Sequence, residues 1–263
     1  MKLLKLEAEM LIFSDFDGTI AETFLPSPNN IGVNQAYEIA CEKIWGNVGV
    51  KRFHAVGGLL NRAPVQLIEH MMMDDCNWWL ENSKSFWDFN KNKAELNLIP
   101  EGMGVSLERD TPPLLFMSEV LVRVKLQIMM KEISPEWPLP CKGFLGFYKK
   151  FQGDLAIISS GHDLFIQKVF NSWGVRMPFC LITDDVMRSD QASIPLEKRF
   201  KPQIGAFIFF EKKYGPIKKD QTVYVGDSLV HDGGLAENFG IPFIWFSKEK
   251  GGVDNWELIK GWQ

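Results

Sequence analysis

The sequence predicts an α/β protein in which a doubly wound parallel sheet carries an inserted, mainly helical domain. Short apolar runs bounded by turn residues recur along the chain, and such runs are typical of strands buried on both faces of a parallel sheet. Helix-like segments separate the later runs, whereas residues 24–140 show helical patterns and no comparably clear strand. Strand alternating with helix predicts a Rossmann-like layered core.

Five apolar runs are the predicted strands: "MLIF" at 10–13, "LAII" at 155–158, "FCLI" at 179–182, "TVYV" at 222–225 and "FIWF" at 243–246. Helices are expected at 162–174, 204–215 and 228–240. Gly174 and Gly215 stand where the first two helices would end, because glycine readily adopts the conformation that terminates a helix. The third is weakened by its paired glycines.

Residues 24–140 are interpreted as a helical insertion after the first strand. Helices are expected at 32–46, 63–73 and 114–133, whereas 74–93 is aromatic and polar without a clean period. Three prolines in 134–140 cannot continue a helix and suggest a return linker. The predicted domains are therefore 1–23 with 141–263 as the α/β core, and 24–140 as the helical domain.

Composition excludes several classes of protein. The chain has 263 residues, 46% of them hydrophobic, and a net charge of −4, so a general nucleic-acid surface is not suggested. The four cysteines lack CxxC spacing, which argues against a zinc site or a disulfide framework. No apolar run approaches the ~18 residues of a membrane span. We expect a soluble, cytoplasmic protein that binds neither nucleic acid nor a membrane.

The stretch "MLIFSDFDGTIAET" at 10–23 delivers two carboxylates to the end of a buried strand. Residues two apart in a strand point the same way, so Asp15 and Asp17 can project together, and Gly18 permits a tight turn. Carboxylates this close repel unless a cation or a shared proton lies between them. The rest of the chain is therefore expected to supply a positive charge.

Three later segments supply suitable partners. "VYVGDSLVHD" at 223–232 ends a strand with Asp227 and places Asp232 five residues later, and clustered carboxylates suit a hard cation such as Mg²⁺. "AIISSG" at 156–161 ends a strand near a helix start, where hydroxyl and backbone N–H groups favour an anion. Its candidate phosphate-binding residues are Ser159, Ser160 and Gly161. "RFKPQ" at 199–203 adds Lys201.

The ordered motifs "DFDGTI", "IISSG", "FKP" and "GDSLVHD" resemble those of the haloacid dehalogenase-like (HAD) hydrolase superfamily. They span residues 15 to 232. The resemblance implies that Asp15 is a nucleophile forming an aspartyl-phosphate and that Asp17 is the general acid and base. It also implies that Ser159 and Lys201 hold the phosphoryl group. Mg²⁺ would be bound by Asp15, the main-chain carbonyl of Asp17 and Asp227, with Asp232 in support.

The same resemblance implies a phosphatase for a small phosphorylated metabolite, with residues 24–140 as a helical cap. Arg62 on that cap is a candidate for binding the substrate, although a lone arginine is more often a surface or packing residue. Two alternatives stay open: a phosphomutase of the same superfamily and a non-catalytic interaction protein on this scaffold. A dehalogenase is disfavoured because that branch does not use the second aspartate. Substrate identity and oligomeric state also stay open.

Overall fold

The computed structural model describes residues 10–59, 64–72, 75–91, 111–189 and 194–259. These residues form two compact units. The core unit contains the described residues up to Glu22 and from Pro138 onward, and the second unit is Thr23–Trp137. The core unit is an α/β layer around a parallel sheet, and the inserted unit is mainly helical, so the predicted fold class is confirmed.

The described residues of the core unit form a five-stranded parallel sheet in the order β3-β2-β1-β4-β5. The strands are β1 (Leu11–Ser14), β2 (Asp154–Ser159), β3 (Cys180–Thr183), β4 (Thr222–Gly226) and β5 (Phe243–Trp245). The central strand β1 pairs with β2 on one side and with β4 on the other. The direction of the strand order reverses at β1, and open α/β sheets bind ligands at the carboxyl ends of strands beside such a reversal.

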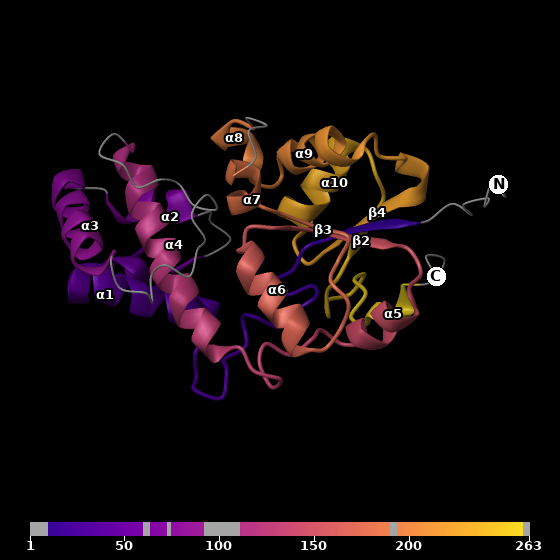
Figure 1. Ribbon diagram of the computed structural model, residues 1–263, viewed down its shortest axis with the longest axis horizontal. Coiled ribbons are helices and arrows are strands. Elements are labelled where there is room, and N and C mark those ends of the chain that lie inside the picture. The colour runs from indigo at the N-terminus through magenta and orange to yellow at the C-terminus, as the bar shows by residue number, and fades with distance from the viewer. Residues whose placement is uncertain (1–9, 60–63, 73–74, 92–110, 190–193, 260–263) are drawn as a thin grey trace. The chain divides into compact units, whose positions relative to one another are not determined.

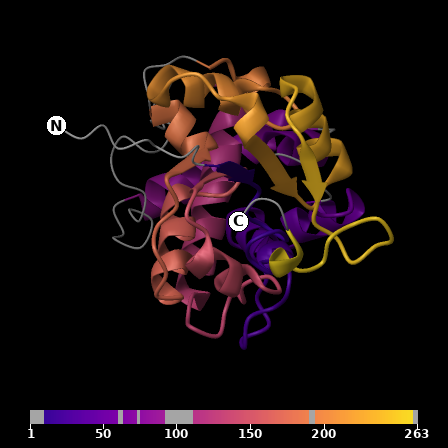
Figure 2. The same ribbon diagram turned by 90° about the vertical axis from the view of Figure 1, so that its right-hand side faces the viewer.

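Helices cover both faces of this sheet. Figure 1 shows α9 and α10 on one face and α5 and α6 on the other, and the turned view of Figure 2 shows the same separation. Phe13 of β1 packs edge-on against Phe207 of α9, with ring centroids 4.9 Å apart. The burial of both faces explains why the strands read as continuous apolar runs. The core helices are α5 (Phe144–Lys150), α6 (Asp163–Ser172), α7 (Asp184–Ser189), α8 (Leu196–Arg199), α9 (Gly205–Tyr214) and α10 (Gly234–Phe239).

The helix expected at 228–240 is divided into two parts. A π-helical turn, Leu229–Gly233, precedes α10. The carbonyl of Ser228 accepts hydrogen bonds from the N–H groups of both Asp232 (2.9 Å) and Gly233 (3.0 Å), so this turn holds one residue more than an α-helical turn. The widened turn comes directly after β4, at the carboxyl edge of the sheet.

The inserted unit contains α1 (Val33–Ala55), α2 (Pro64–Met71), α3 (Cys76–Asn90) and α4 (Pro113–Glu132). Helix α1 continues beyond its expected end, with a non-helical break at Gly46. Helix α3 was not expected from the pattern. It begins at an N-cap, Asp75, whose side chain accepts the N–H of Trp78 at 3.1 Å. Its buried residues are Trp79 and Ser83. Because one of them is a serine, the buried face of α3 does not appear as a repeat of apolar residues in the sequence.

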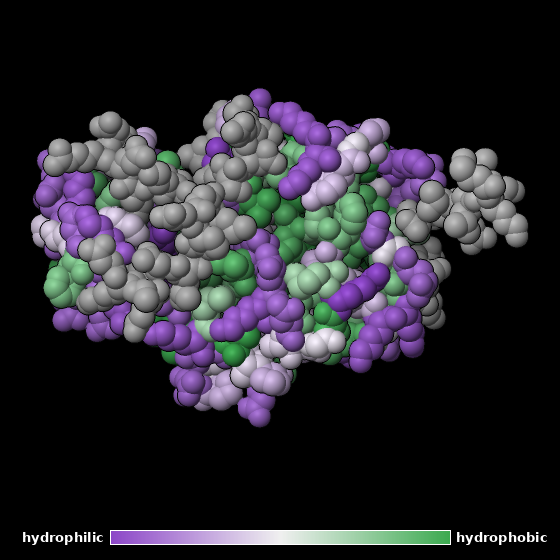
Figure 3. Space-filling view, in the orientation of Figure 1, coloured by the Kyte–Doolittle hydropathy of each residue, from purple (hydrophilic) through white to green (hydrophobic). Residues whose placement is uncertain are grey.

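Apolar side chains reach the surface of the core unit around β3 and α9 (Figure 3). Phe179 is 47% exposed, and its ring lies 5.1 Å from that of Tyr214, which is also exposed. Because β3 is the edge strand of the described sheet, this patch borders an unpaired strand edge. None of the described helices combines the length and the apolar character needed to cross a bilayer.

Candidate active site

Strand β1 places Asp15 at the centre of the sheet's carboxyl edge. The N–H of Asp15 donates to the carbonyl of Val225 at 2.9 Å, which extends the pairing with β4 by one residue. Gly18 then adopts φ 76°, a conformation that favours glycine, and its N–H donates to the carbonyl of Ala21 at 2.8 Å. Gly18 therefore forms the tight turn that the sequence predicts.

Three carboxylates meet at this edge. Asp15, Asp227 and Asp232 each offer an oxygen, and these oxygens lie within 4.8 Å of one another. Asp15 and Asp232 are buried, whereas Asp227 is partly exposed. Asp15 comes from the end of β1, and the other two follow β4, its neighbour in the sheet. Adjacent parallel strands therefore bring together residues more than 200 positions apart in the sequence.

Lys201 supplies a positive charge to this cluster. Its Nζ lies 2.5 Å from Oδ1 of Asp15 and 2.7 Å from Oδ1 of Asp232, and its side chain is 10% exposed. Lys198, the other lysine of this segment, is exposed. The structure thus places Lys201, and not Lys198, beside the two aspartates.

The turn after β4 fixes the carboxylate of Asp232. Its Oδ2 accepts the N–H of Ser228 at 3.0 Å, and its Oδ1 accepts the hydroxyl of Tyr224 at 3.1 Å in addition to Lys201. A Cβ atom added at Gly226 would lie 2.4 Å from the side chain of Asp232. Only glycine at position 226 therefore allows this close approach.

Burial and charge shift the protonation of the cluster. Burial raises the pKa of Asp15 well above its usual range, the Lys201 ammonium opposes this shift, and the nearby carboxylates raise the pKa further. Burial, followed by the charge of Asp232, raises the pKa of Asp227 to about 6. Burial alone would lower the pKa of Lys201, but Asp15 and Asp232 together raise it well above its ordinary value. Lys201 therefore stays charged, while the carboxylates carry unrelieved repulsion that a bound cation would reduce.

The loop after β2 closely approaches Asp17, two residues after Asp15. Ser159 is buried, and its hydroxyl oxygen accepts the N–H of Gly161 at 2.9 Å. A Cβ atom added at Gly161 would lie 3.6 Å from Oδ2 of Asp17, so the backbone of this loop closely approaches that carboxylate. The structure thus brings the first and second predicted motifs together.

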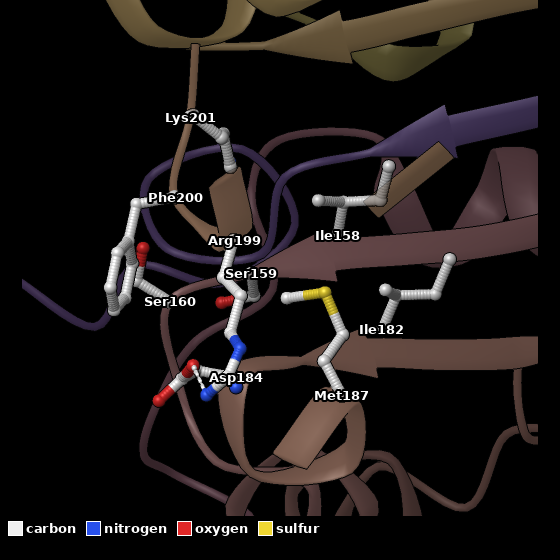
Figure 4. A pocket seen from close by; sticks show the side chains of 9 residues that line it. All are labelled: Ile158, Ser159, Ser160, Ile182, Asp184, Met187, Arg199, Phe200 and Lys201. Atoms are coloured by element: carbon white, nitrogen blue, oxygen red, sulfur yellow. Dashed lines mark ion pairs between the residues drawn. The ribbon is translucent and has the colours of Figure 1, made fainter. Parts of the chain in front are cut away.

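Ser159, Ser160 and Lys201 line one pocket (Figure 4). An ion pair between Arg199 and Asp184, with Nη1 and Oδ1 3.7 Å apart, stands on the side of this pocket away from Lys201. The other lining residues are Ile158, Ile182, Met187 and Phe200. The pocket thus brings residues of the second and third predicted motifs together.

A second buried pair supports the loop after β2. Helix α6 has no side-chain cap of its own at His162. Instead, the carboxylate of Asp185 from α7 accepts the N–H of Asp163 at 3.3 Å and lies 3.3 Å from Nδ1 of His162. Asp185 therefore replaces the missing cap and ties the start of α6 to the end of β3.

The predicted site residues can now be placed. Asp15, Asp227, Asp232 and Lys201 form one cluster. Gly161 approaches Asp17, and Ser159 and Ser160 share a pocket with Lys201. The side chain of Asp17 is not among the clustered carboxylates. The resemblance implies that Asp17 binds the metal through its main-chain carbonyl instead. Arg62 lies outside the described residues.

Sequence reasoning missed Tyr224 and Asp185. Tyr224 was read as one apolar residue of a strand, yet a buried tyrosine needs a partner for its hydroxyl group. That requirement was the available signal. Asp185 follows a strand with no motif around it, and its partner, the start of α6, is 22 residues earlier in the chain. No local pattern predicts that contact.

Comparisons with known proteins identify solved structures of similar fold, but no match at the level of sequence. A scan against protein-family models matches none of them, and a search of curated protein sequences finds no match. The structure is similar to that of CbbY from Rhodobacter sphaeroides in complex with phosphate, with a TM-score of 0.50 and 14% identity over 94% of this chain and 92% of that chain.

Two further solved structures are similar at lower scores. A predicted phosphoglycolate phosphatase from Haemophilus somnus has a TM-score of 0.47 and 14% identity, over 91% of this chain and 86% of that one. The putative HAD-hydrolase YfnB from Bacillus subtilis bound to magnesium has a TM-score of 0.44 and 12% identity, over 94% and 92%. At these identities the likeness concerns the fold alone. The chain has the fold of the haloacid dehalogenase-like hydrolases.

Proposed function

We propose that this protein is a Mg²⁺-dependent phosphatase that hydrolyses a small phosphorylated metabolite through an aspartyl-phosphate on Asp15. The observation that carries the proposal is the position of the Lys201 ammonium between Asp15 and Asp232, with Asp227 in the same cluster. Phosphoryl transfer depends mainly on in-line positioning and on neutralisation of the phosphate charge. The cluster provides a carboxylate nucleophile, Asp15, and a positive charge, on Lys201, that can neutralise the phosphate.

The residues divide the reaction into two steps. In the first, an oxygen of Asp15 forms a bond to phosphorus, the bond from phosphorus to the leaving oxygen breaks, and Asp17 gives that oxygen a proton. In the second, Asp17 takes a proton from water, whose oxygen bonds to phosphorus and releases the Asp15 carboxylate. Ser159 and Lys201 hold the phosphoryl oxygens in both steps. A carboxylate nucleophile thus replaces one difficult displacement by two easier ones.

The carboxylate cluster fits Mg²⁺. Oxygens bound to one Mg²⁺ at about 2.1 Å lie at most about 4.2 Å apart, so the oxygens of Asp15 and Asp227, which already lie within 4.8 Å, need only a small inward movement. With every group ionised, three carboxylates and one ammonium leave a formal charge of −2, which a divalent cation balances. Asp15 and Asp227 would be the main side-chain ligands. When bound, the cation would stabilise charge that develops on the phosphoryl oxygens.

The helical unit is proposed to act as a cap that selects the substrate. It is inserted between β1, which carries Asp15, and β2, which carries Ser159. A helical unit at this point of the chain can exclude water from the reaction and contact the leaving group. Arg62 belongs to that unit in sequence and is retained as a candidate for binding the substrate.

A screen of phosphomonoesters with and without Mg²⁺ tests the proposal. We expect release of inorganic phosphate from at least one small phosphorylated metabolite, and loss of that release when Mg²⁺ is removed with a chelator. Asp15→Asn should reduce release to the background of the assay while the protein stays folded. Asp220→Asn is the matched control, because Asp220 is exposed and lies outside the cluster.

The products distinguish the alternatives. A phosphomutase would convert a sugar phosphate to its isomer and release little inorganic phosphate. An interaction protein on this scaffold would release no phosphate from any compound, and the wild type and Asp15→Asn would give the same background signal. Either result would contradict the proposed phosphatase.

A further inference from the structure

Tyr224 lies beneath the proposed site in strand β4. It is fully buried, and its hydroxyl oxygen is 3.1 Å from Oδ1 of Asp232 and 3.5 Å from the carbonyl oxygen of Ile158. A phenol has one proton to donate, and the shorter distance directs it to Asp232. The Nζ of Lys201 lies 5.8 Å from the centre of the same ring. Tyr224 therefore contacts one member of the cluster through its hydroxyl and faces another with its ring.

This hydrogen bond changes what Asp232 can do. Oδ1 of Asp232 accepts both Lys201 at 2.7 Å and Tyr224 at 3.1 Å, and Oδ2 accepts the N–H of Ser228 at 3.0 Å. A carboxylate has about four acceptor positions, so three donors leave little capacity for a metal ion. The two donors on Oδ1 hold this oxygen in place, so it resists the further inward movement that sharing a cation with Asp15 and Asp227 would require.

We propose that Tyr224 is a positioning residue that holds Asp232 toward Lys201 and away from direct metal coordination. The inference rests on the proposed function, because Lys201 is expected to hold the transferring phosphoryl group. Asp232 is the second anchor of Lys201, and the first anchor is the nucleophile Asp15. Fixing the second anchor fixes the ammonium group at the point where the phosphoryl oxygens would lie.

Tyr224→Phe tests the inference because it removes one oxygen and keeps the buried ring. Asp232 would lose a donor, its Oδ1 could turn toward the cation, and Lys201 would lose part of its second anchor. We expect kcat to fall about tenfold to a hundredfold, the range for one hydrogen bond to a charged group. We expect Mg²⁺ to bind about tenfold more tightly in the absence of substrate, the low end of the same range for one hydrogen bond to a charged group.

The chain offers a matched control in Tyr148→Phe. Tyr148 is also buried in the core unit, and its hydroxyl donates to the carbonyl of Met177 at 3.2 Å. Its ring packs against Phe144, Phe170 and Arg176, none of which is a proposed site residue. Both variants lose one buried tyrosine hydrogen bond of similar length. Tyr148→Phe should change neither kcat nor the Mg²⁺ dissociation constant measured by calorimetry, although it lowers stability.

Opposite changes in the two readouts distinguish positioning from a general loss of structure. A merely structural role for Tyr224 predicts unchanged or weaker Mg²⁺ binding together with a kcat like that of Tyr148→Phe, and this result would overturn the inference. Asp232→Asn provides a second check, because Tyr224→Phe should have no further effect on kcat in that background. A full additional loss in the double variant would also overturn it.

The calorimetric arm separates this inference from the proposed function. If the wild-type protein hydrolyses no phosphomonoester, the proposed function fails, yet Mg²⁺ binding to the wild type and to Tyr224→Phe can still be compared. Tighter binding in the variant supports the positioning of Asp232 by Tyr224. Equal or weaker binding contradicts it.

Discussion

Replacing Lys201 with methionine removes the ammonium group that pairs with Asp15 and Asp232. The Lys201 side chain is 10% exposed and lies 2.5 Å and 2.7 Å from the two carboxylate oxygens. An exposed ion pair contributes only about 0–1 kcal/mol, but removal of one partner of a buried pair costs about 3–5 kcal/mol because the other charge stays uncompensated. We therefore expect Lys201→Met to lower the free energy of unfolding by about 3–5 kcal/mol at pH 7 without a divalent cation.

Urea denaturation in the presence of a chelator measures this loss. Lys198→Met is the control, since Lys198 is exposed in the same segment and its removal should change the free energy of unfolding by no more than about 0.5 kcal/mol. Mg²⁺ should stabilise Lys201→Met more than it stabilises the wild type, because the variant cluster carries one more negative charge. Similar small effects of the two lysine substitutions would refute the reasoning.

Three further predictions concern the surroundings of the cluster. Burial raises the pKa of Asp227 from its ordinary 3.8 to about 6, so without metal the folded protein favours the protonated carboxyl group. The resulting contribution to the free energy of unfolding is fully present below pH 4. Thermal unfolding should show that contribution, up to roughly 3 kcal/mol, being lost as the pH rises through 6, and Mg²⁺ should oppose the loss. Gly226→Ala should cost about 1–3 kcal/mol in urea denaturation and lower kcat, because the new Cβ meets Asp232. Asp185→Asn should raise KM with little change in kcat, because Asp185 and His162 support the loop after β2; an unchanged KM would contradict that support.

The strands and the carboxylate pattern could be predicted because both are local in sequence. Each run of apolar residues that the pattern identified overlaps a strand of the sheet, since burial on both faces requires such runs. Asp15 and Asp227 could be predicted to meet because parallel strands bring their carboxyl ends to one edge. The elements that depend on spacing and burial alone were therefore accessible from sequence.

Contacts between distant polar groups could not be predicted. Helix α3 is held by a hydrogen bond that the indole N–H of Trp45 donates to the hydroxyl of Ser83. A buried serine adds nothing to the repeat of apolar residues by which a helix is recognised in a sequence. Tyr224 has the pattern of any buried strand residue, and only the folded chain shows that its hydroxyl meets Asp232. The lysine is different, because the motif "FKP" indicated Lys201 from the sequence and the structure places Lys201 beside Asp15 and Asp232.

Detection of the covalent intermediate tests the central claim most directly. The protein is mixed with a phosphomonoester that it hydrolyses and with Mg²⁺, quenched rapidly in acid, digested and analysed by mass spectrometry. We predict a single phosphoryl group on the peptide that contains Asp15, located at that residue and absent from Asp15→Asn. A phosphoryl group on Ser159, or steady turnover with no phosphorylated residue, would contradict the account.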